Sequence, residues 1–154
     1  MTIMGKKRED GRYYVEGRIP QPNLRSGKPE DIFTSFLIDS SQRTTIISES
    51  EALKHEIEYK SFNLKKNAFS KNSRIFDAYE ITDLEIIFAS QDRHPYYRQK
   101  FIRIFIPLEK TSYNNLEPSS VLGLDFLERF TIRFLRPEPT SGGIVLKKIK
   151  RPKL

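Results

Sequence analysis

The sequence contains no cysteine, and this absence excludes several kinds of site at once. Without cysteine the chain has no disulfide framework, no thiolate nucleophile and no cysteine-ligated metal centre. It also lacks any apolar run that approaches the length of a membrane span. The first ten residues hold no apolar stretch long enough for a signal peptide. These absences predict a soluble, cytoplasmic protein with no membrane partner.

Histidine is scarce, with two residues in the whole chain. His55 and His94 lie far apart, and no other ligand stands at a metal-binding spacing from either of them. The sequence also contains no zinc motif and no glycine-rich loop of the kind that cradles phosphate. We therefore expect neither a metal site nor a cofactor.

The length of 154 residues is sufficient for a buried core and fits one domain. We predict a domain over residues 12–146, with a flexible basic N-terminal tail at 1–11 and a basic C-terminal tail at 147–154. The formal net charge is +7. This charge is compatible with a nucleic acid or an acidic partner, but solvated faces are the simpler explanation.

Short apolar segments alternate with turn residues along the chain, which is typical of strands. The segments that indicate strands are 12–19, 32–38, 76–88 with a break near Thr82-Asp83, 96–108, 131–135 and 144–149. Ser48 with Glu51 three residues later predicts a capped helix start, and residues 124–130 predict a second short helix. Many strands with few helices indicate an all-β fold, either a barrel or a sandwich.

One carboxylate stands at the end of a strongly apolar strand. Asp39 follows Phe36-Leu37-Ile38, precedes Ser40 and Ser41, and is followed by a second apolar segment at Thr44–Ile47. A carboxylate at the end of a buried strand must be hydrogen-bonded or functional. On its own the tripeptide is better explained by an aspartate that caps a turn of serines.

A second segment far downstream, Val121-Leu122-Gly123-Leu124-Asp125-Phe126-Leu127, joins an apolar pair and a glycine to a helix start. In this order the two segments resemble the motifs of the retropepsin-like (retroviral-type) aspartic proteases. The family has Asp-Thr/Ser-Gly after an apolar strand, and Ile/Val-Leu-Gly downstream. The resemblance covers roughly residues 12–136, and it implies an acid-protease barrel with one short C-terminal helix.

The resemblance implies that Asp39 is the catalytic residue of an aspartic endopeptidase. That chemistry uses two neighbouring carboxylates that share one proton, because like charges so close do not both ionise. The ionised group takes a proton from water, and the protonated group polarises the scissile carbonyl. Since the chain carries one such aspartate, the resemblance implies a homodimer with Asp39 of each chain at a two-fold axis. The implied substrate is a peptide or an unfolded protein.

The resemblance also implies roles for neighbouring residues. Those that would support the pair of aspartates are Ser40, Ser41 and Thr45. Those that would pack behind the Asp39 loop are Val121, Leu122 and Gly123. A mobile hairpin, the flap, would lie within 64–74, and its candidate residues are Lys65, Lys66, Asn67, Ala68, Phe69, Ser70, Lys71 and Asn72. Asp125 and Arg129 lie four residues apart, which is a favourable spacing for an exposed helix pair.

Two features depart from the family pattern. Ser41 stands where the family has glycine, and Gln42 replaces a small residue. A side chain at Ser41 would either crowd the site or donate a hydrogen bond to Asp39. The flap segment holds no glycine, so Asn67 or Asn72 would have to adopt a left-handed turn conformation. Two hypotheses follow: an active peptidase, or a catalytically degenerate dimer of the same fold that binds a peptide or, less favoured, a nucleic acid.

Overall fold

The structure is a computed structural model that describes residues 1–20, 30–71, 74–91, 95–108, 119–135 and 143–149. Two short helices, α1 and α2, cover Glu49–Lys54 and Leu124–Leu127. The strands β1 to β9 are Thr2–Lys7, Tyr13–Ile19, Ile32–Ile38, Asn63–Lys71, Arg74–Ala89, Tyr96–Pro107, Ser120–Leu122, Phe130–Phe134 and Gly143–Lys148. The predicted all-β class is confirmed. Within the described ranges no helix is long and apolar enough to cross a membrane.

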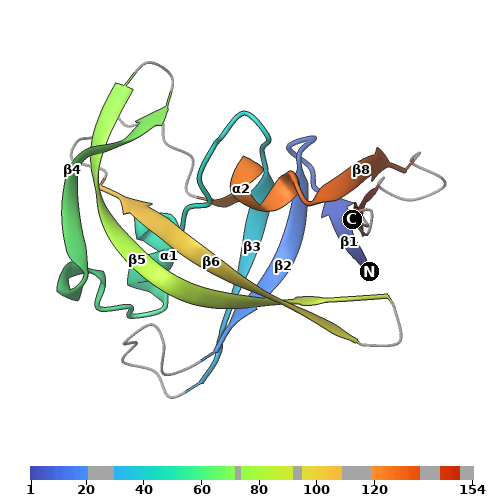
Figure 1. Cartoon of the computed structure of the whole chain (residues 1–154), viewed down its shortest axis with the longest axis horizontal. Helices are drawn as coiled ribbons and strands as arrows, with labels where there is room; N and C mark the ends of the chain where they lie inside the picture. The colour runs from blue at the N-terminus through green and yellow to red at the C-terminus, as the bar shows by residue number, and fades with distance from the viewer. Residues whose placement is uncertain (21–29, 72–73, 92–94, 109–118, 136–142, 150–154) are drawn as a thin grey trace, which may run out of the picture.

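All nine strands belong to one sheet with the order β4-β5-β2-β1-β9-β8. Three strands lie off this path, because β6 pairs with β5, β3 pairs with β2, and β7 pairs with β3. Every ladder is antiparallel except that between β3 and β7. Figure 1 shows β5 and β6 crossing the length of the molecule, with β4 at one end and β8 near β1 at the other.

The strand ladders do not close the sheet as a barrel, which corrects the expectation of an acid-protease barrel. The segment that returns from the Asp39 turn contributes single bridges, from Ile46 to Phe105 in β6 and to Val121 in β7. A full strand at this position would have joined the two sides with a ladder. Residues 45–47 therefore link β6 to β7 over a short distance, because Thr45 and Ile47 bond to Phe105 whereas Ile46 bonds to Val121.

The predicted break near Thr82-Asp83 is a local distortion of a continuous strand. Asp83 has a φ of 56°, yet β5 runs unbroken and keeps its register with β6 on both sides of this residue. Short polar residues such as aspartate tolerate this left-handed conformation.

The core is centred on the aromatic ring of Phe126 in α2. Its ring centroid lies 4.9 Å from that of Phe88 and 4.8 Å from that of Phe130. A fully buried phenylalanine contributes about 1.5–3 kcal/mol to stability. This burial fixes α2 against the sheet, although the helix is too short to be stable alone.

The predicted flexible tail at 1–11 is wrong, because residues 2–7 form β1. This strand lies between β2 and β9, and its Ile3 side chain is 1% exposed. The charged residues of the segment hid the strand, because Ile3 is the one large apolar side chain that it buries. Residues 147 and 148, placed in the C-terminal tail, likewise belong to β9, whereas 150–154 lie outside the described residues.

Gly5 offers a test of whether the first strand is part of the folded core. A Cβ atom at Gly5 would lie 2.6 Å from Cγ2 of Ile144 and 2.7 Å from the carbonyl oxygen of Tyr14. We expect Gly5→Ala to lower the free energy of unfolding by about 1–3 kcal/mol in chemical denaturation. Met4→Ala, at an exposed side chain of the same strand, is the control and should change it by less than about 1 kcal/mol. Equal stability of wild type and Gly5→Ala would contradict this placement.

Candidate active site

Asp39 lies where β3 ends and the chain turns back. β3 and β7 run parallel, with Leu37 beside Val121, and the backbone N–H of Asp39 donates to the carbonyl of Leu122 at 3.3 Å. The returning chain pairs with the other side of β7, because Ile46 and Val121 exchange hydrogen bonds of 2.9 and 3.0 Å. β7 thus lies between the two arms of the Asp39 loop and holds both.

The Asp39 side chain is half-buried, and one of its carboxylate oxygens is held within the turn. Oδ1 accepts from the backbone N–H of Ser41 at 3.0 Å and from its hydroxyl at 2.5 Å. The Asp39 carbonyl accepts from the N–H of Gln42 at 3.2 Å, which closes the turn. Oδ2 accepts no hydrogen bond from the described part of the chain.

Ser41, the departure from the family glycine, therefore adds a donor to Asp39. Its backbone N–H makes the contact that a glycine could also make, and the hydroxyl adds a second one. The side chain is exposed, and so is that of Ser40 at the tip of the turn. Within this chain, the serine binds the carboxylate and faces solvent.

Gly123 crosses the Asp39 loop at very short range. A Cβ atom at Gly123 would lie 2.7 Å from the carbonyl oxygen of Gln42 and 2.8 Å from the carbonyl carbon of Thr44. Both obstacles are backbone, so no side-chain movement could make room for it. The next residue, Leu124, donates its N–H to the same Gln42 oxygen at 2.7 Å. Residues 121–123 consequently lie directly behind the loop.

Asp125 also binds the loop, a role that the sequence did not reveal. Its carboxylate oxygens each accept from the N–H of Thr45 at 3.1 Å, and Oδ1 also accepts from the Thr45 hydroxyl at 2.7 Å. The Thr45 hydroxyl in turn accepts from the N–H of Gly123 at 3.1 Å. The spacing of four residues in the sequence favoured a helix pair of Asp125 with Arg129. Instead, α2 ends at Leu127 and the carboxylate points to Thr45.

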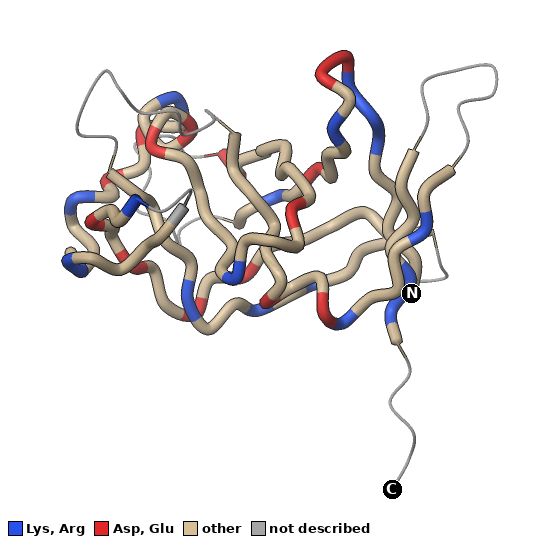
Figure 2. Tube along the Cα trace, turned by 90° about the horizontal axis from the view of Figure 1, so that it is seen from above, with Lys and Arg blue, Asp and Glu red and all other residues tan. Residues whose placement is uncertain are grey.

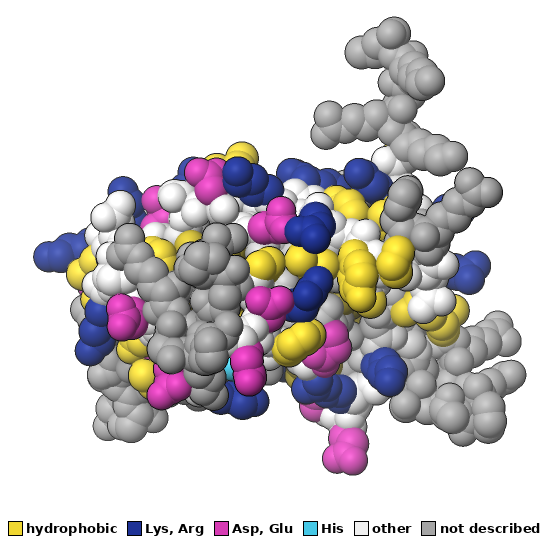
Figure 3. Space-filling view, turned by 90° about the horizontal axis from the view of Figure 1, so that it is seen from below, with side chains coloured by type: hydrophobic (Ala, Val, Ile, Leu, Met, Phe, Trp, Pro, Cys, Tyr) yellow, Lys and Arg dark blue, Asp and Glu magenta, His cyan; other side chains and the backbone are white. Residues whose placement is uncertain are grey.

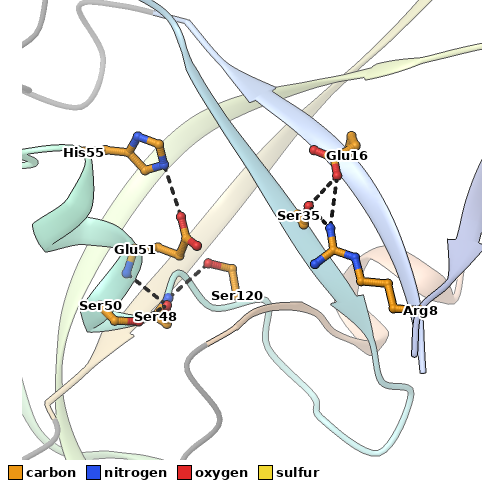
Figure 4. Close-up of polar contacts among 8 residues, drawn as sticks. All are labelled: Arg8, Glu16, Ser35, Ser48, Ser50, Glu51, His55 and Ser120. Atoms are coloured by element: carbon orange, nitrogen blue, oxygen red, sulfur yellow. Dashed lines mark hydrogen bonds and ion pairs between the residues drawn. The ribbon is translucent and has the colours of Figure 1, made fainter. Parts of the chain in front are cut away.

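Polar contacts also fix the elements that flank the loop (Figure 4). The N–H of Ser48 donates to the hydroxyl of Ser120 at 3.1 Å, which joins the start of α1 to β7. Ser48 also caps α1 as predicted, since its hydroxyl accepts from the N–H of Glu51 at 3.2 Å. His55 contacts Glu51 at 3.1 Å, whereas His94 lies outside the described residues. In the parts of the chain that are described, no group of acidic and histidine side chains could hold a metal ion.

The predicted flap segment is a hairpin of β4 and β5. Asn67 has the left-handed conformation considered for it, with a φ of 53°, but it lies at a bulge and its N–H donates to Asp77 at 3.0 Å. Phe69 is buried in the same apolar cluster as Leu37 and Val121, so the hairpin is packed beside the Asp39 loop. The side chains of residues 65–67 and 70 are exposed, Ala68 is half-buried, the Lys71 side chain is not described, and Asn72 lies outside the described residues.

Comparison with known proteins agrees with this architecture. The chain resembles the crystal structure of a retropepsin-like aspartic protease from Rickettsia conorii, with a TM-score of 0.57 and 18% sequence identity. The match covers 95% of this chain and 89% of that one. The fold is that of the retropepsin-like proteases. No protein-family model and no curated protein sequence matches the chain.

Replacement of Asp125 tests its contribution to the Asp39 loop of this retropepsin-like fold. We expect Asp125→Ala to lower the free energy of unfolding by roughly 2–4 kcal/mol, because the N–H and hydroxyl of Thr45 lose a charged acceptor. Asp125→Asn keeps one acceptor oxygen and should lose about half as much. Thermal and chemical denaturation measure both. If both variants are as stable as wild type, the carboxylate charge and its hydrogen bonds do not hold the loop.

Proposed function

We propose that the protein is a homodimeric aspartic endopeptidase in which Asp39 of each chain forms the catalytic pair. The observation that carries the proposal is the position of this carboxylate. It stands at the end of β3 in a loop held by β7, within a retropepsin-like fold. The loop is held by the close approach of Gly123 and by the hydrogen bonds of Asp125, which supports a defined orientation of the carboxylate before any substrate binds.

The two oxygens of Asp39 have different environments, which suits the proposed chemistry. Ser41 donates two hydrogen bonds to Oδ1, whereas Oδ2 is available to a water molecule or to the second aspartate. In the dimer one carboxylate is ionised and removes a proton from water, and the other is protonated and polarises the scissile carbonyl. Ser40 is exposed at the tip of the turn, and in the proposed dimer it would bond to the partner loop.

The substrate in this proposal is an extended peptide or an unfolded protein. The β4–β5 hairpin packs beside the Asp39 loop through Phe69 and would cover the bound peptide as a flap. Lys65 and Lys66 are exposed on this hairpin. They would favour acidic side chains in the substrate segments that pass beneath them.

The alternative of a degenerate dimer that binds a peptide rests on Ser41 and on a flap without glycine. Binding of nucleic acid has less support, because Lys and Arg are interspersed with Asp and Glu along the described part of the chain trace (Figure 2). On the face shown in Figure 3, acidic and basic side chains are interspersed with apolar ones. A phosphate backbone is usually bound by a continuous basic stripe.

Cleavage of an unfolded protein between about pH 3 and pH 7 tests the peptidase, since a pair of carboxylates that shares a proton works in acid. We expect wild type to cleave, a statine-type transition-state analogue to block cleavage, and Asp39→Asn to lose about a thousandfold or more in rate. Asp83→Asn is the control, because it removes an exposed carboxylate elsewhere at a position that suits asparagine.

Ser41→Gly separates the two donors to Asp39 in the same assay. The backbone N–H remains and the hydroxyl is lost, so we expect cleavage to be retained within about tenfold. A folded, dimeric wild type that cleaves nothing across this pH range would support the degenerate alternative. Cleavage by Ser41→Gly alone would identify the serine hydroxyl as the cause of lost activity.

A further inference from the structure

The apolar surface next to Asp39 is already covered within the single chain. It is formed by Leu37 and Ile46, one on each arm of the Asp39 loop, and by Val121 of β7 between them. These three side chains are 5%, 4% and 1% exposed. A peptide bond held at Asp39 would place the side chains on either side of it within reach of this surface. Another part of the chain therefore occupies space that a substrate side chain would need.

Phe69 of β4 is the large side chain that the β4–β5 hairpin contributes to this cover. It belongs to the same buried cluster and is 2% exposed. The other buried member from the hairpin is Ala78, whose side chain is small. Phe76 packs against the cluster from outside, with its ring centroid 6.0 Å from that of Phe69. The hairpin is thus held against the Asp39 loop mainly through one aromatic ring.

The end of the hairpin has few ties to the rest of the sheet. β4 is an edge strand, because it stands at the end of the sheet order. The ladder between β5 and β6 ends where Ala78 lies beside Pro107, and the N–H of Leu108 then donates to the carbonyl of Asp77 at 2.9 Å. Among the described strands, residues 74–76 pair with β4 alone. Withdrawal of this end would therefore break no ladder to a third strand.

A bulge in β4 provides a position at which the hairpin can bend. The register with β5 shifts between Lys65 and Phe69, and Asn67 within the bulge has a φ of 53°. The N–H of Asn67 donates to the side chain of Asp77 at 3.0 Å instead of to a backbone carbonyl. A bulge interrupts the regular ladder and bends its strand. The segment beyond the bulge can consequently move while the base of the hairpin stays paired.

We propose that Phe69 is an autoinhibitory plug, which occupies the apolar surface beside Asp39 in the free protein and withdraws when substrate binds. The hairpin pivots at the Asn67 bulge, and opening exposes one aromatic ring to water. A large apolar side chain of the substrate is the group that replaces it, because such a side chain restores the buried contacts that Phe69 gives up. The proposal rests on the proposed function, since a plug regulates the Asp39 site only if substrate binds there.

A plug and a residue that only contacts the substrate predict opposite effects for the same substitution. Removal of a side chain that contacts the substrate weakens the complex. Removal of a side chain that takes the place of the substrate raises the fraction of protein that is competent to bind, so the complex becomes tighter. The sign of the change on truncation of Phe69 therefore distinguishes the two roles.

Calorimetric binding of a statine-type inhibitor with large apolar side chains to the full chain measures this sign. We expect Phe69→Ala to bind it about threefold to thirtyfold more tightly than wild type does. Phe33→Ala is the matched control, at a phenylalanine of β3 that is 63% exposed, and should leave the dissociation constant unchanged. Circular dichroism shows whether each variant is folded. If Phe69→Ala unfolds, Phe69→Leu replaces it and should tighten binding by a smaller factor, because it keeps part of the buried volume.

A tryptophan at position 69 reports the plug directly, because the chain contains no tryptophan of its own. In the free Phe69→Trp protein we expect blue-shifted emission that acrylamide quenches poorly. Bound inhibitor should shift this emission to the red and increase its quenching, since the indole leaves the apolar cluster. The control, Phe33→Trp, should show the emission of an exposed indole with and without inhibitor.

The outcomes separate the plug from the peptidase. Tighter binding by Phe69→Ala, or binding by this variant when wild type does not bind, supports the plug. Equal or weaker binding by a folded Phe69→Ala, or an indole that stays buried in the inhibitor complex, overturns the plug and leaves the peptidase in place. If neither protein binds the inhibitor or cleaves an unfolded substrate, the proposed function is overturned and the plug with it.

Discussion

The crossing of Gly123 over the Asp39 loop is the constraint on which the rest of the site depends. Two backbone segments from distant parts of the sequence meet there with no space for a Cβ atom. This contact brings β7 between the two arms of the loop, where it bonds to both. A wider approach would separate Thr45 from Asp125 and leave polar groups without partners in a largely buried place. The glycine is therefore a condition of the fold as well as of the site.

The same crossing explains why the departure at Ser41 is compatible with the fold. The tight contact lies on the Gln42 and Thr44 side of the loop, whereas the Ser41 side chain points to solvent. A serine there adds no steric conflict within the chain, and its hydroxyl reaches the carboxylate. Serine can therefore replace glycine at position 41 without disturbing the packing behind the loop. Consequences for chemistry are confined to the exposed side, where substrate and partner would lie.

Local sequence patterns predicted the elements whose formation depends on residues close together in the sequence. The apolar run before Asp39, the cap at Ser48 and the alternating pattern of residues 96–108 all correspond to observed elements. The resemblance to retropepsin-like proteases predicted the fold that the comparison supports. What depends on distant partners was missed. From its sequence β1 resembles a charged tail, because its strand character depends on pairing with β9. Asp125 likewise resembles a residue on a helix surface, because its partner Thr45 is distant in the sequence.

A loop that is already braced within one chain alters what the proposed association has to accomplish. In this chain the Asp39 loop is held by its own β7 and α2, so little ordering of the loop would remain if a second copy bound. Binding loses free energy to every segment that it must immobilise, and a preorganised loop reduces that loss. The association energy can then come from a surface remote from the carboxylate.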